Sequence, residues 1–166
     1  MKRLFKVIFY TLLIAFVLLQ FYPKPGKNLT AIIDRSDIAI VHNVPLNVQS
    51  VLKTSCFNCH SNNTIYPWYS RVQPFAHFLG DHIYEGKKEL NFSEFGKYGI
   101  GKQYRKLEEA AEQIDEDDMP LTSYTLIHSD AKLNKDKKLL LSDWIATLRD
   151  SIRANYPADS LIRKKR

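Results

Sequence analysis

The sequence predicts an all-α protein. Four segments place apolar residues at helical spacing, and no segment shows the sustained alternation of apolar and polar residues that is typical of a strand. The chain has 166 residues, of which 45% are hydrophobic and 25% are charged, an ordinary globular composition. This length suffices for one domain.

Four helices follow from the spacing. The first begins after Pro45, a residue that suits the first helical turn, and the second and third are expected near residues 73–84 and 101–116. The fourth has the clearest start, because Asn134 is a good N-cap and Asp136 lies in the first turn. The expected faces are Val48, Val51, Leu52 and Ser55; Phe75, Phe78, Leu79 and His82; Tyr104, Leu107, Ala111 and Ile114; and Leu141, Ile145, Leu148 and Ile152, with Trp144 alongside.

Residues 1–22 predict a membrane anchor. Three basic residues within residues 2–6 begin an apolar run that ends at Tyr22, and a helix from Leu4 to Tyr22 is roughly 28 Å long. That length nearly matches a hydrocarbon core of about 30 Å. A cleaved signal peptide is the alternative, but bulky side chains occupy the end of the run, where cleavage needs small ones. We therefore expect an uncleaved N-terminal transmembrane helix.

The remaining chain divides into three parts. Prolines and a glycine in FYPKPGK stop any helix, so residues 23–44 are expected to form a linker or an extended arm along the domain. Residues 45–152 form the predicted domain. Residues 153–166 form a basic C-terminal tail, with a frayed end at Arg163 to Arg166.

Charge and cysteine content exclude several classes. The formal net charge is +6, and half of it lies within residues 1–22. The rest of the chain has no dense stripe of Lys and Arg with interleaved aromatic residues, so no nucleic-acid partner is expected. Two cysteines only three positions apart cannot form a disulfide framework. We therefore expect the two cysteines to take part in chemistry and not to crosslink the fold.

Cys56, Cys59 and His60 form a CxxCH motif, which suits covalent attachment of a c-type haem. Two thiols on one helical turn can form thioethers with the two vinyl groups of one porphyrin, while the adjoining imidazole binds the iron. A zinc site is an alternative, but the chain lacks a second cysteine pair. A redox dithiol usually follows a strand, and here a predicted helix precedes the motif.

The iron has a sixth position, for which Met119 is the preferred ligand. Besides the initiator it is the only methionine, and it lies in the polar stretch DDMP, where simple packing would be an unusual use. The thioether suits a low-spin electron carrier. His77, His82 and His128 are alternative ligands, and an open site is a further alternative.

An aromatic segment follows the motif. Tyr66 and Trp68 are expected to cover the porphyrin, and their polar atoms, with Arg71, to hydrogen-bond its propionates. Ordinary core packing is the alternative for each aromatic residue.

Several motifs occur together and in order: CFNCH, SNNTIYPWYS, HIYEGKKELNFSEF, DDMPL and SYTLIHSDAKL. Through them the chain resembles a small bacterial haem-binding domain family of c-type cytochrome character over about residues 45–149. The resemblance implies a cytochrome c-like helical fold, thioethers at Cys56 and Cys59, and iron ligands at His60 and Met119. It also implies an exported or membrane-anchored protein.

The expected function is that of a membrane-anchored monohaem c-type cytochrome. It would carry one covalent haem c with its iron, and pass single electrons between redox partner proteins without acting as an enzyme. Covalent attachment occurs outside the bacterial cytoplasm, so we expect a single-pass inner-membrane protein whose haem domain faces the periplasm. A haem-based sensor or scaffold with a displaceable sixth ligand and a haem-free dithiol oxidoreductase are the alternatives.

Overall fold

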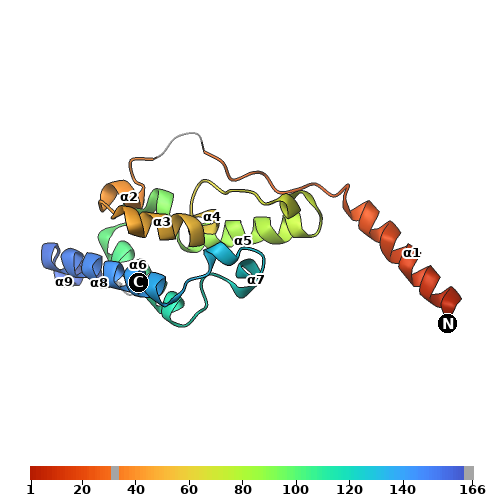
Figure 1. Ribbon diagram of the computed structural model, residues 1–166. Coiled ribbons are helices and arrows are strands. Elements are labelled where there is room, and N and C mark those ends of the chain that lie inside the picture. Colours follow the sequence, from red (N-terminus) through yellow and green to blue (C-terminus); the bar gives the residue numbers. More distant parts are fainter. Residues whose placement is uncertain (31–33, 163–166) are drawn as a thin grey trace.

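The computed structural model describes residues 1–30 and 34–162, and every regular element in these ranges is helical (Figure 1). The all-α prediction is therefore confirmed. In chain order the α-helices and the short 3-10 helices (η) are α1 (Lys2–Leu19), α2 (Ile38–Val41), α3 (Leu46–Ser55), α4 (Phe57–His60), η1 (Trp68–Arg71), α5 (Phe75–Glu89), η2 (Phe92–Lys97), α6 (Ile100–Asp115), α7 (Thr122–Thr125), η3 (Ser129–Ala131), α8 (Lys135–Asn155) and α9 (Ala158–Leu161).

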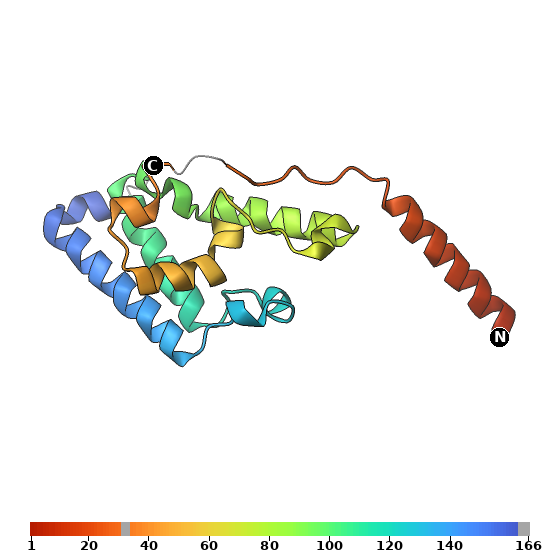
Figure 2. The same cartoon turned by 45° about the horizontal axis from the view of Figure 1, so that its top comes forward.

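The core lies where α6 and α8 pack side by side and α3 crosses them (Figure 2). Burial of apolar side chains is the main stabilising contribution in such a cluster. The predicted faces of α3, α6 and α8 point into it, and Leu148 is the one member of the α8 face that stays only half-buried. Asn134 caps α8 as predicted, because its Oδ1 accepts a hydrogen bond from the Lys137 amide at 2.9 Å. The most deeply buried core residues are Ile38, Val48, Phe95, Leu107 and Leu141.

The predicted face of α5 has a different environment. Its members Phe75, Phe78, Leu79 and His82 do lie on one side, where they line an apolar cavity of about 380 Å³ together with Cys59. Phe75 and Phe78 nevertheless remain 52% and 55% exposed. Helical spacing thus identified the shared face, but Ala76, Leu79 and Ile83 are the α5 residues that are buried.

The core begins before the predicted domain boundary. Residues 38–41, expected to belong to a linker, form the short helix α2, and Ile38 is completely buried. At the other end, residues 158–161 form α9 within the predicted tail, and Leu161 packs on the same core. The predicted frayed end at Arg163 to Arg166 lies outside the described residues.

Residues 20–30 form an extended arm along the domain, the second of the two expected arrangements. The side chain of Gln20 accepts from the Gln73 amide at 3.0 Å and donates to the Gln73 carbonyl at 3.1 Å. Pro25 packs so closely on Gly80 of α5 that a Cβ there would come within 2.7 Å of the proline ring. Further on, the Asn28 side chain donates to the Ser61 carbonyl at 2.8 Å. The arm is therefore held at several points.

Helix α1 stands apart from the domain at the end of this arm (Figures 1 and 2). All of its residues are exposed, and the three basic residues at its start fall within its 18 residues. In the described ranges, no helix combines the length and the apolar character that crossing a membrane requires. The prediction of a transmembrane helix over residues 1–22 is thus not supported, because the helix ends at Leu19 and includes Lys2, Arg3 and Lys6.

Candidate haem site

The CxxCH motif occupies one helical turn at the end of α3. Cys56 ends α3, where its amide donates to the Leu52 carbonyl at 2.8 Å, and it precedes α4. The amides of Cys59 and His60 both donate to the Cys56 carbonyl, at 3.2 and 3.0 Å. This turn brings the two thiols and the imidazole together without a strand before them. Both cysteines are free.

Gly86 lets α5 approach this turn closely. A Cβ at this position would lie 3.0 Å from the Cys59 carbonyl oxygen and 3.3 Å from the Cys59 Cβ. These separations are tight, so a larger side chain would displace one of the two backbones. The glycine in HIYEGKKEL thus has a steric role that no local pattern in the sequence indicates.

His60 is held in one tautomer by the backbone that follows α5. Its Nδ1 lies 3.0 Å from the Leu90 carbonyl oxygen, which can only accept, so Nδ1 carries the proton. Burial lowers the pKa of His60, and nearby Lys106 lowers it further, whereas hydrogen bonds with the backbone of Leu90 and Gly86 raise it in part. The imidazole is therefore neutral at physiological pH, and its Nε2 lone pair is available for a metal.

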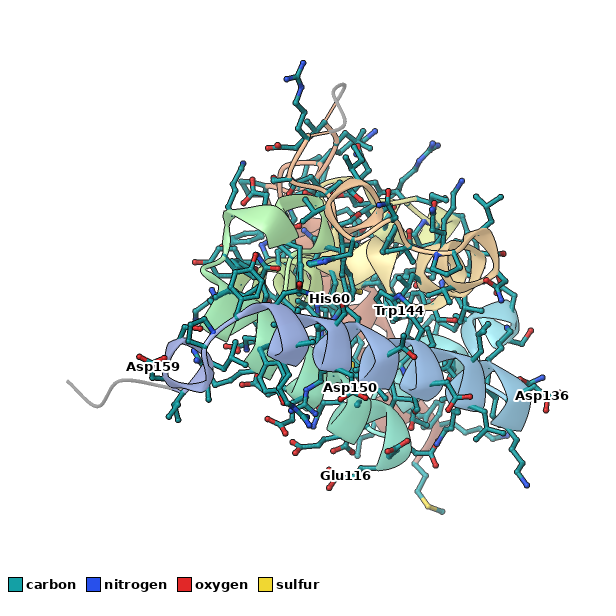
Figure 3. The ribbon with its side chains drawn as sticks, turned by 90° about the vertical axis from the view of Figure 1, so that its left-hand side faces the viewer. His60, Glu116, Asp136, Trp144, Asp150 and Asp159 are labelled. Carbon is teal, nitrogen blue, oxygen red and sulfur yellow. The ribbon has the colours of Figure 1, made fainter. Side chains whose placement is uncertain are left out.

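Two adjoining cavities open beside His60, with volumes of about 320 and 200 Å³. Cys56, His60, Glu89 and Met119 line both of them. Trp144 of α8 lines the larger cavity together with His60, and both residues are labelled in Figure 3. Most of the other walls of the larger cavity are apolar core side chains, namely Leu52, Phe92, Phe95, Leu107, Ile114, Leu141 and Ile145. The space is thus an opening in the core that suits a flat apolar cofactor.

Met119 reaches these cavities from the turn after α6. Asp117 adopts the left-handed conformation, with φ of 62°, which ends the helix. The Met119 amide then donates to the Gln113 carbonyl at 3.0 Å. The half-buried thioether shares both cavities with Cys56 and His60, although Met119 lies 59 residues after His60 in the sequence.

Only one of the three alternative histidines lies at these cavities. His82 lines the smaller one with Met119, and its Nδ1 lies 2.7 Å from the Phe78 carbonyl oxygen. His77 instead hydrogen-bonds with Gln73 beneath the arm. His128 contacts the Tyr69 hydroxyl at 2.8 Å and lines neither of the two cavities.

Tyr66, Trp68 and Arg71, which the sequence predicts to contact the cofactor, lie away from the two cavities beside His60. The Tyr66 hydroxyl accepts from the Asn28 amide at 2.6 Å, and Trp68 is 78% exposed. Arg71 is also exposed, and none of the three lines either cavity beside His60. Trp68 and Arg71 belong to η1, which precedes the start of α5, whereas Cys59 packs against Gly86 near the end of that helix.

The thiols are poorly suited to dithiol chemistry. Burial, with a smaller contribution from Cys59, raises the pKa of Cys56 to about 12, and burial also raises the pKa of Cys59. A reactive dithiol needs the opposite shift, because the thiolate is the nucleophile. Within the described ranges, no group of three or more His, Cys, Asp and Glu side chains gathers as a metal site.

Comparison with known proteins identifies the family of the chain. Residues 14–147 match the haem-binding domain family. Searches of curated proteins and of solved structures each returned no match. The matched range covers most of the chain and includes the cysteines, His60 and Met119. The chain therefore belongs to the haem-binding domain family.

Proposed function

We propose that this haem-binding protein is a monohaem c-type cytochrome that transfers single electrons. The observation that carries the proposal is the joint placement of Cys56, His60 and Met119 at the same two cavities, with Cys59 at the smaller one. Two thiols, one imidazole and one thioether form the donor set of a covalently held haem with two axial ligands.

The cysteines would hold the haem through thioethers. Each S–H adds across one vinyl group, so that sulfur bonds to one vinyl carbon and hydrogen to the other. No oxidant is needed. Cys56 and Cys59 belong to one helical turn, which suits two attachment points on one porphyrin.

His60 and Met119 would supply the two axial ligands. The neutral imidazole offers Nε2 because Leu90 holds the proton on Nδ1. A thioether opposite an imidazole raises the reduction potential relative to two histidines, and an iron with both positions filled suits electron transfer. The apolar walls of the larger cavity would limit the contact of a bound haem with water.

A haem-based sensor is the second candidate, and His82 favours it. This side chain lines the smaller cavity together with Met119, so it is placed to replace the thioether. Carbon monoxide separates the two candidates, because rapid binding to the native protein indicates a labile sixth ligand.

We propose a location outside the cytoplasm, at the periplasmic face of a bacterial inner membrane. Covalent haem attachment takes place there, and redox partner proteins would be met there. The exposed apolar side chains of α1, with Lys2, Arg3 and Lys6 at its start, support an association with the membrane.

The test is to export the full chain together with a haem-maturation system. We expect mass spectrometry to find one haem bound through Cys56 and Cys59, and the oxidised spectrum to show the weak methionine-to-iron band at its red end. Met119→Ala should lose this band and His82→Ala should keep it. Bare cysteines in the mature protein would refute the proposal, and absence of this band from the native protein would refute Met119 as the sixth ligand.

A further inference from the structure

Among the side chains that line the larger cavity, carboxylates outnumber cationic groups. Glu89, Glu109 and Glu112 contribute carboxylates to its wall. Lys106 is the only Lys or Arg among the described residues that line this cavity or the smaller one. Arg71, the cation expected from the sequence to meet the cofactor, is exposed and lies elsewhere.

Lys106 is more protected from water than its partners. Its side chain is 17% exposed, whereas those of Glu89 and Glu109 are 68% and 52% exposed. Its Nζ donates to Glu109 at 2.6 Å and to Glu89 at 3.2 Å. An ammonium group has three donors, so one N–H remains beyond these two bonds.

The position of Lys106 links the cavity to His60. Its neighbour Leu107 is 2% exposed and belongs to the core, so the backbone of α6 is firmly held at this point. The ion pair with Glu89 joins α6 to the end of α5, one residue before the Leu90 carbonyl that accepts from His60. The ammonium group therefore has a defined place beside the histidine.

A haem bound in this space brings two propionate groups, which are ionised at neutral pH. Beside three carboxylates, this added negative charge requires a cation, and hydrogen bonds between charged groups are the strong ones. We propose that Lys106 binds a haem propionate with its third N–H. The inference rests on the proposed function, since it takes the haem to occupy the cavities beside His60.

The test compares two porphyrins that differ only at the propionates. Full-length protein carrying C56A and C59A is titrated with haemin and with haemin dimethyl ester, with Lys106 present and with K106Q. We expect K106Q to weaken haemin binding about tenfold or more and to leave ester binding unchanged, because only the free acid offers the ionised partner. The matched control is K102Q on the same helix, since Lys102 lies over the Tyr98 ring at 3.9 Å and lines neither cavity.

Every other outcome counts either against the role of Lys106 or against the proposed haem site. Equal losses for haemin and ester, or no loss for either, would overturn the role of Lys106 while leaving haem binding intact. Failure of both porphyrins to bind a folded protein that keeps Lys106 would instead count against the proposed haem site. If the cysteine variant does not fold, resonance Raman spectra of the covalent protein decide, because K106Q should shift the propionate bending band and K102Q should not. An unshifted band in K106Q would overturn the inference.

Discussion

The Nδ1 atom of His60 lies 3.0 Å from the carbonyl oxygen of Leu90, which is 30 residues further along the chain. This contact joins the CxxCH turn to the end of α5 and leaves Nε2 of the imidazole free. Because a carbonyl only accepts, the same bond also selects the tautomer that can bind iron. The site is thus prepared for its ligand by the backbone, and several measurable consequences follow from the packing around it.

The cysteines of protein made without haem maturation should resist alkylation. The pKa of Cys56 lies near 12 because of burial, and burial also raises that of Cys59, so few thiolates exist in mildly alkaline buffer. We expect slow labelling by iodoacetamide in the native state and fast labelling in urea, as measured by mass spectrometry. Fast labelling of the native protein would instead favour dithiol chemistry.

Gly86→Ala should destabilise the protein although alanine favours helices. The added Cβ would lie 3.0 Å from the Cys59 carbonyl oxygen, so α4 or α5 must move. We expect the free energy of unfolding to fall by about 1–3 kcal/mol, as measured by urea denaturation. Gly26→Ala, at an exposed position outside the helices, is the control, because its Cβ meets nothing within 4 Å, and it should change the value by less than about 0.5 kcal/mol. Equal effects of the two substitutions would contradict the close packing.

Asn28→Ala should release the arm from the domain. The Asn28 side chain donates to the Ser61 carbonyl and to Thr64 at 2.8 and 2.9 Å, and it accepts from Lys87 at 2.6 Å. Loss of these bonds should cost about 1–3 kcal/mol and speed proteolysis within residues 20–30. Lys27→Ala, at an exposed neighbouring position, should leave the cleavage rate unchanged. An equally protected arm in Asn28→Ala would show that its contacts do not hold it.

Asp34 should make stability depend on pH in the acid range. A hydrogen bond from Lys97, with further ones from Ser36, lowers its pKa from 3.8 to about 2. The carboxylate of Asp34 is therefore protonated more readily in the unfolded chain than in the folded protein. The stabilisation from its hydrogen bonds is present above pH 3.8 and is lost as the pH falls through about 2. Asp34→Asn should flatten the stability curve over that interval, as measured by acid-dependent thermal unfolding. An unchanged slope in Asp34→Asn would contradict the pairing of this carboxylate with Lys97.

Much of the helical architecture was predictable because it depends on local spacing. The buried faces of α3, α6 and α8 match the expected periodicity, and the Asn134 cap is where the sequence predicts it. Helix α2 was missed because four residues are too few to show a helical period. The exposure of Phe75 and Phe78 also escaped prediction, since a shared face indicates a common direction but not what covers it.

The sequence by itself determined the all-helical class and the local grouping of Cys56, Cys59 and His60, because helical periodicity and CxxCH spacing act within one or a few turns of the chain. Only the tertiary structure decided which distant groups join that turn. It places Met119 and His82 at the cavities, and it leaves His77, His128 and Arg71 outside. It also brings Lys106 there, which lies 46 residues after His60. The physical reason is that the packing of α5 against α4 and of α6 against α8 sets these positions, and no local pattern of residues contains that information.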